Sequence, residues 1–154
     1  MNSEREARYP SVYTIGYQGT EIREFIDILQ SQSITGVIDV REVPLSRKPG
    51  FSKNKLSDAL AAVSIKYIHV KDLGSPSSLR EKLKHDGDNE YFIEKYSEYL
   101  MTRMNIIESL YEYTIIKETS CLMCMERNPD HCHRRIIAEK LMKIGNNHLQ
   151  VVHI

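Results

Sequence analysis

The sequence predicts one α/β domain of three layers, in which helices cover both faces of a mainly parallel sheet. Short runs rich in β-branched residues alternate with runs of helical periodicity between residues 11 and 154, and this alternation is typical of parallel sheets with crossover helices. The length of 154 residues suits a single domain. We therefore expect one domain over residues 11–154, preceded by a flexible lead-in over residues 1–10, which is polar and ends in Pro10.

The first half of the chain contains three predicted strands and two predicted helices. The strands cover residues 11–15, 36–40 and 65–70, which are rich in β-formers. Thr20 is the predicted N-cap of the helix after the first strand, and Ser52 is that of the helix after the second. Both helices carry an apolar stripe at helical spacing. Its residues are Ile22, Phe25, Ile26 and Leu29 in one helix and Leu56, Ala59, Leu60 and Val63 in the other.

The second half contains two predicted strands and two predicted helices. The strands cover residues 120–124 and 149–154, and one long helix is predicted over residues 91–115. The segments 73–78 and 85–89 carry glycine, serine, asparagine or proline and are predicted to be loops. A last helix follows the polar loop after the fourth strand. Its apolar residues are Ile137, Leu141 and Ile144.

Composition excludes several classes of protein. The 21 basic side chains equal the 21 acidic ones, which excludes a generally polybasic nucleic-acid binder but leaves room for a local basic patch. No apolar run approaches the roughly 20 residues of a membrane helix, and the polar N-terminus lacks the apolar core of a signal peptide. The three cysteines do not form the framework of a secreted protein. We expect a cytoplasmic protein that does not bind membranes.

The residues that carry chemistry fall in loops that follow predicted strands. Ligands of open α/β sheets bind outside the carboxyl ends of the strands, and four loops qualify: 16–20, 41–52, 71–80 and 124–133. The first loop lacks a complete dinucleotide or P-loop spacing. It is either a tight turn between strand and helix or a set of free amides that faces an anion.

The second loop is locally basic. Between Arg41 and Lys55 there are five basic residues and one acidic residue. This run is either a solvated face or an anion-binding loop held in shape by its prolines, glycine and aromatic residue, with Arg41 and Arg47 as forked donors. Asp39, at the end of the preceding strand, either orients Arg41 as an ion pair or titrates during catalysis. His69 is either a satisfied polar residue of the third strand or part of the same site.

The third loop contains a cluster of cysteine and histidine. Cys121 and Cys124 lie three positions apart in a predicted strand, so their side chains face opposite sides of the sheet. We therefore predict no metal site here and interpret Cys121 as a small buried hydrophobe. The alternative, a zinc site that uses both residues, requires the strand to bend or to end at Met123.

Three residues of this cluster stand at a predicted helix start. The helix dipole and free amides there lower the pKa of Cys132 and attract anions, and His133 and Arg134 strengthen both effects. The alternative is that His133 and Arg134 only pair with Glu126 and Asp130.

In their order along the chain, these motifs resemble the domain-of-unknown-function family 488. The matching pieces are Tyr13-Thr-Ile-Gly16, Asp39-Val-Arg41, Pro44-Leu-Ser-Arg47, Pro49-Gly-Phe-Ser52 with Leu56, Tyr67, Leu73-Gly74, Cys124-Met-Glu126 and Cys132-His-Arg134. The resemblance implies a compact intracellular α/β domain and brings no established reaction. The chain departs from the pattern at Tyr17, where a histidine is common, and at Ser75, where a second glycine often follows. A weaker similarity links Asp39-Val-Arg41 to the strand end of rhodanese-type sulfurtransferases.

These observations predict a small enzyme that acts on a phosphate-bearing ligand, such as a nucleotide or a nucleic-acid end, in a pocket formed by the loops 41–52 and 124–134. Candidate catalytic residues are Asp39, Glu126, Cys132 and His133. Candidate ligand-binding residues are Arg41, Ser46, Arg47, Tyr67 and Arg134. Cys132 or Cys124 is the candidate nucleophile if the reaction is covalent. The alternatives are a non-catalytic nucleic-acid-binding module and a rhodanese-like sulfur-transfer domain. The sequence identifies no cofactor.

Overall fold

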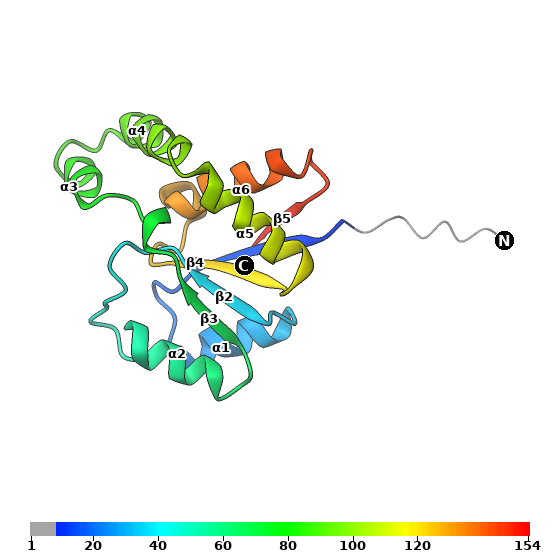
Figure 1. Cartoon of the computed structure of the whole chain (residues 1–154). Helices are drawn as coiled ribbons and strands as arrows, with labels where there is room; N and C mark the ends of the chain where they lie inside the picture. The colour runs from blue at the N-terminus through cyan, green and yellow to red at the C-terminus, as the bar shows by residue number, and fades with distance from the viewer. Residues whose placement is uncertain (1–8) are drawn as a thin grey trace.

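Five parallel strands form one sheet in the order β3-β2-β4-β1-β5. The computed structural model describes residues 9–154, so the predicted lead-in over residues 1–10 lies almost entirely outside the described residues. The strands are β1 (Ser11–Gly16), β2 (Gly36–Asp39), β3 (Lys66–His69), β4 (Ser120–Cys124) and β5 (Gln150–His153). The predicted parallel sheet is confirmed (Figure 1).

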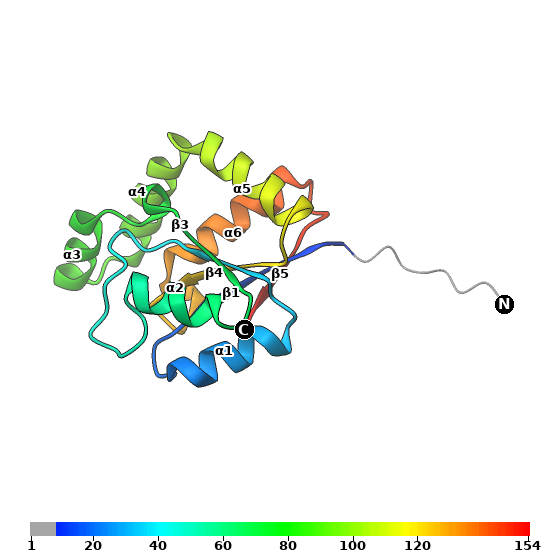
Figure 2. The ribbon, with the colours of Figure 1, turned by 60° about the horizontal axis from the view of Figure 1, so that its bottom comes forward.

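Helices cover both faces of the sheet, which confirms the three-layer prediction. Figures 1 and 2 show α1 and α2 on one face, and α4, α5 and α6 on the other. The helices are α1 (Ile22–Ser31), α2 (Lys53–Ala61), α3 (Ser77–Asp86), α4 (Asn89–Met101), α5 (Met104–Ile116) and α6 (His133–Ile144), with short 3-10 turns at Lys71–Leu73 and Pro129–His131. None of the helices within residues 9–154 has the length and apolar character required to span a membrane.

Each face of the sheet has its own hydrophobic core. Val37 of β2 packs with Phe25 and Leu60 on the side of α1 and α2, whereas its neighbour Ile38 packs with Ile137 on the side of α6. This division follows from the alternation of side chains along a strand. Every residue of β2 and β4 is buried, and burial on both faces explains why their apolar residues do not alternate with exposed polar ones.

The strand order places the carboxyl ends of three strands side by side. β4 lies between β1 and β2, and the register pairs Gly16 with Cys124 and Asp39 with Met123. Because the strands are parallel, the loops that follow β1, β2 and β4 leave from the same edge. The prediction that the loops 41–52 and 124–134 share one end of the sheet therefore agrees with this topology.

Three local predictions differ from the structure. The helix predicted over 91–115 is two helices, because Thr102 Oγ1 donates to the Tyr99 carbonyl and closes α4 in a tight turn. The helix α3 was not predicted, because it buries no residue and lacks a clear apolar stripe. Glu21 rather than Thr20 is the N-cap of α1, whereas Ser52 is the N-cap of α2 as predicted.

Candidate functional site

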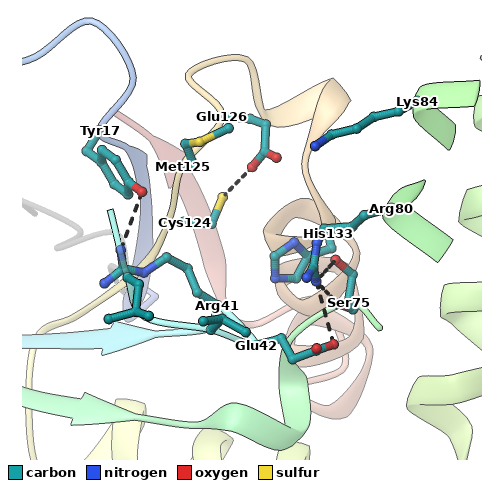
Figure 3. A pocket seen from close by; sticks show the side chains of 12 residues that line it. Tyr17, Arg41, Glu42, Ser75, Arg80, Lys84, Cys124, Met125, Glu126 and His133 are labelled. Carbon is teal, nitrogen blue, oxygen red and sulfur yellow. Dashed lines mark hydrogen bonds and ion pairs between the residues drawn. The ribbon is translucent and has the colours of Figure 1, made fainter. Parts of the chain in front are cut away.

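A cavity of about 240 Å³ lies at the carboxyl edge of β1, β2 and β4 (Figure 3). Its wall on one side comes from the loop after β2, and α3 supplies the other side. The end of β4 and the first residue of α6 form the floor between them. The residues that carry charge or a reactive group in this lining are Arg41, Glu42, Arg80, Lys84, Cys124, Glu126 and His133.

Two glycines allow the walls of the cavity to pack against the strand ends. A Cβ atom built on Gly16 would overlap the backbone carbonyl of Glu126, and one built on Gly74 would overlap the backbone nitrogen of Glu42. Both neighbours are main-chain atoms and cannot move aside as a flexible side chain would. The close approach of the segments that carry Glu126 and Glu42 therefore requires glycine at both positions.

A buried ion pair stands behind the cavity. Arg41 donates from Nε to Asp39 Oδ1 (2.8 Å) and from a terminal nitrogen to Oδ2 (2.6 Å). Tyr67 donates its hydroxyl to the same carboxylate at 2.5 Å. Burial alone would lower the pKa of Arg41, but the carboxylate of Asp39 raises it overall. Burial and the bond to Asp39 also raise the pKa of Tyr67.

The remaining donors of Arg41 hold the loop in place. Its other terminal nitrogen donates to the carbonyl of Phe51 (2.8 Å) and to the hydroxyl of Tyr17 (3.4 Å). The rings of Tyr17 and Phe51 stack at 4.5 Å, and Phe51 meets Phe25 of the core edge-on. Four of the five N–H groups of Arg41 are thereby used. This geometry favours Asp39 as the residue that orients Arg41.

A second arginine is buried without a carboxylate partner among residues 9–154. Arg134 has no exposed surface. It donates to Cys124 Sγ (3.2 Å), to Thr14 Oγ1 (3.3 Å) and to the carbonyls of Glu126 and Arg127. Burial lowers the pKa of Arg134. Its guanidinium ties β1, the end of β4 and the following loop to the first turn of α6.

Two cysteines and a histidine meet at the cavity floor. Cys132 is the N-cap of α6, as the sequence predicts. Its Sγ lies at bonding distance from Cys124 Sγ, with the two Cα atoms 7.5 Å apart. Cys124 Sγ lies 3.4 Å from Glu126 Oε2. Cys124 and Cys132 are both buried, while Glu126 is partly exposed.

The imidazole of His133 is held in one tautomer. Its Nε2 lies 2.6 Å from the carbonyl of Val40, and because a carbonyl only accepts, Nε2 carries the proton. Nδ1 therefore presents a lone pair, and it lies 3.8 Å from Cys132 Sγ. Burial lowers the pKa of His133, which favours this neutral form.

The rim of the cavity is cationic on one side and apolar on the other. Lys84 extends from α3 toward Glu126 (Figure 3). Arg80 lies 3.6 Å from Glu42 and also donates to Ser75. The apolar rim consists of Val43, Leu45 and Met125, which are 50%, 71% and 47% exposed.

The structure brings most of the predicted site residues together. Arg41, Glu126 and His133 line the cavity, and Cys132 and Arg134 lie buried beside its floor. Asp39 and Tyr67 stand behind Arg41. Ser46 and Arg47 do not line it. Ser46 exchanges hydrogen bonds with Ser52 within the loop, and Arg47 is exposed.

Backbone contacts bear on two open interpretations. The amides of Tyr17 and Gln18 donate to the carbonyls of Cys124 and Met125. These bonds support the interpretation of the first loop as a turn between strand and helix, while an anion site at the amides that begin α1 stays a prediction. His69 bonds to the carbonyl of Arg41 at 2.7 Å and is a satisfied polar residue outside the cavity lining.

Sequence reasoning missed the residues that α3 contributes. Arg80 and Lys84 lie on this helix, and neither was a candidate. Two signals could have found it: Ser78 with Glu81 has the spacing of a capping box, and Gly87 ends the helix in the left-handed conformation, with φ of 68°.

Comparison with known proteins gives one match. The family model described as "Domain of unknown function DUF488" matches residues 21–141, which is most of the chain. No curated protein and no solved structure matches the chain significantly. Nothing in these results supports the similarity to rhodanese-type sulfurtransferases.

Proposed function

This chain belongs to the DUF488 family, and because that description names no activity, we propose a function from the cavity itself. We propose that the protein is a small enzyme that acts on a phosphate-bearing ligand. The observation that carries the proposal is the pairing of two cations from α3 with a floor that contains Cys124, Glu126 and His133. An enzyme that acts on a phosphate requires cationic donors that bind the phosphate and, next to them, a group that can transfer a proton.

The cations of α3 are the anion-binding groups in this proposal. Lys84 makes no ion pair within the described part of the chain, so it is free to bind a phosphate. Arg80 meets Glu42 at 3.6 Å and donates to Ser75, and it would exchange these contacts for a phosphate. Arg41 is not free to do so, because nearly all its donors are held by Asp39, Phe51 and Tyr17.

The apolar rim indicates what accompanies the phosphate. Val43, Leu45 and Met125 leave a large apolar surface exposed beside the cations. A ligand that carries a flat apolar group next to its phosphate would cover this surface and gain from its burial. A nucleotide or the end of a nucleic acid has both parts.

Glu126 is the proton-transfer group in this proposal. It is partly exposed in the cavity and is not held in an ion pair within residues 9–154. A carboxylate so placed accepts a proton from an attacking water or returns one to a leaving group.

Binding to defined probes tests the anion site. We expect adenosine monophosphate to bind more tightly than adenosine in calorimetry, and Lys84→Gln to weaken that binding about tenfold, the loss typical of one charge-assisted contact. Lys82→Gln is the matched control, because Lys82 lies on the same helix and pairs with Asp86 at 2.8 Å. Equal binding of adenosine and its monophosphate, or equal effects of the two substitutions, would contradict the proposal.

Turnover separates an enzyme from a binding module. We expect product, detected by mass spectrometry, from adenosine monophosphate or a 5′-phosphorylated oligonucleotide. Glu126→Gln should lower its rate about a hundredfold or more while binding persists. Binding of the probes without any product would favour the non-catalytic nucleic-acid-binding module.

Thiol-based sulfur transfer is the second candidate, and one contact favours it. Arg134 donates to Cys124 Sγ at 3.2 Å, and a cation so close stabilises a thiolate. This function requires Cys124 to be a free thiolate in the resting protein.

A further inference from the structure

We propose that Cys124, Cys132 and His133 bind a zinc ion whose fourth position opens to the cavity beside Glu126. The three donor atoms lie within 4.8 Å of one another, and all three residues are buried. Two thiolates and one imidazole form a donor set that zinc prefers, and zinc sites with three protein ligands keep one position for water or substrate. This site does not depend on which ligand the cavity takes.

The histidine is prepared as a ligand. Its Nε2–H is held by the carbonyl of Val40 at 2.6 Å, an outer-shell bond that most zinc-binding histidines make. The lone pair of Nδ1 is left on the side of Cys132 Sγ, 3.8 Å away. Zinc–sulfur and zinc–nitrogen bonds in a tetrahedral site place these two atoms about 3.5 Å apart, close to the distance in the structure.

Arg134 lies next to one of the two proposed sulfur ligands. It is completely buried and donates to Cys124 Sγ at 3.2 Å. A cation at this distance stabilises a thiolate. The contact therefore supports Cys124 as a thiolate ligand of the ion.

The backbone spacing also favours an ion over a disulfide. The Cα atoms of Cys124 and Cys132 are 7.5 Å apart, beyond the roughly 4.4–6.8 Å that disulfides span. In a tetrahedral site zinc would hold the two sulfurs about 3.8 Å apart. Cys121 is not part of the site, because it packs in the core on the opposite face of the sheet.

The ion would face the group that moves protons. Cys124, His133 and Glu126 all line the cavity, and the Glu126 carboxylate already lies 3.4 Å from Cys124 Sγ. A water bound at the fourth position would have a lowered pKa and an acceptor for its proton next to it.

Metal content tests the site without any substrate. The full chain, purified under reducing conditions without chelator, should contain one equivalent of zinc by plasma mass spectrometry. Cys124→Ser and Cys132→Ser should lose most of it, whereas Cys121→Ala, the matched control, should retain it. Protein without zinc whose thiols label equally with and without chelator would overturn the proposal, as would an intact mass lower by two hydrogens.

A second measurement tests the site on wild-type protein, in case the cysteine variants fail to fold. Wild-type protein is stripped with chelator and titrated with cobalt(II), which absorbs strongly when thiolates bind it. We expect the thiolate absorption to saturate at one equivalent and to disappear when zinc is added. Absence of that absorption in folded protein would overturn the proposal. Adenosine monophosphate binding, measured on the same stripped protein, reports separately on the anion site.

Discussion

The ion pair of Asp39 and Arg41 shows how a single residue shapes the site without touching a ligand. Asp39 is completely buried and accepts from the backbone and side chain of Arg41 and from Tyr67. Arg41 in turn holds Phe51 and Tyr17, and so fixes the loop after β2. The pair therefore supports the cavity wall.

Asp39→Asn should therefore destabilise the fold. The substitution leaves the charge of Arg41 buried without its partner, and breaking such a pair costs about 3–5 kcal/mol. Urea denaturation measures the free energy of unfolding. The surface pair of Lys82 and Asp86 provides the control, since Asp86→Asn should change the free energy by less than about 1 kcal/mol. Equal effects of the two substitutions would contradict this assignment.

His133 should make stability dependent on pH. Burial lowers its pKa in the folded protein, so the unfolded chain binds the proton first as the pH falls below about 6.5. The unfolded state then holds more protons, and the free energy of unfolding decreases with acidification. We expect chelator-treated protein to show this decrease and His133→Gln to show less of it. Parallel profiles of the two proteins would rule out His133 as the cause.

At the scale of elements, the segments differ in how strongly burial specifies them. The strands β1, β2 and β4 and the helices α1, α2 and α6 were predictable because each buries apolar residues. The strands β3 and β5 have no fully buried residue, and their runs of β-forming residues predicted them instead. The break between α4 and α5 was not predictable, because apolar residues continue on both sides of Thr102. The helix ends there in a turn closed by the Thr102 hydroxyl and by the backbone amides of Thr102 and Arg103. The helix α3 was missed because it has no buried residue to mark it.

The residues of the site also divide into those that the sequence could predict and those that it could not. Asp39, Arg41, Glu126 and His133 stand at strand ends or at a helix start, where sequence order reveals the edge of a parallel sheet. Arg80 and Lys84 reach the cavity from an exposed helix, and only the folded chain brings them there. The convergence of Cys124 with Cys132 also depends on the path of the loop between them.

Since α3 has no fully buried residue and packs only the half-buried Leu79 and Leu83 against the core, it should be the least stable of the elements that line the cavity. Amide hydrogens exchange faster where few apolar contacts hold a helix. Hydrogen exchange with mass spectrometry should show faster exchange in Ser77–Asp86 than in His133–Ile144, whose core residues include Ile137 and Leu141. Saturating adenosine monophosphate should slow exchange in α3, because its cations are the proposed contacts. Protection in α3 equal to that in α6 without ligand would contradict this ranking.

At the scale of the whole molecule, the zero net charge limits the electrostatic attraction between the protein and a nucleic acid. Equal numbers of basic and acidic residues give no net long-range attraction to a nucleic acid, so the proposed binding would come from a few local contacts. The sheet order concentrates such contacts at one edge, where the cavity of about 240 Å³ admits the end of a chain rather than its length. A terminal phosphate is therefore the expected point of recognition.

The salt dependence of oligonucleotide binding distinguishes recognition of a terminal phosphate from binding along the nucleic-acid backbone. With Arg80 and Lys84 as the two phosphate contacts, the logarithm of the affinity of a 5′-phosphorylated single strand should fall with the logarithm of the salt concentration at a slope of about 1.4, because each contact contributes about 0.7. Lys84→Gln should reduce the slope by about 0.7, and removal of the 5′-phosphate should abolish most of the binding. A slope of about 2.8, four contacts at about 0.7 each, that does not depend on the 5′-phosphate would instead indicate that Arg47, Lys48, Lys53 and Lys55 hold the backbone. That result would favour a nucleic-acid-binding module over an enzyme that acts on a chain end.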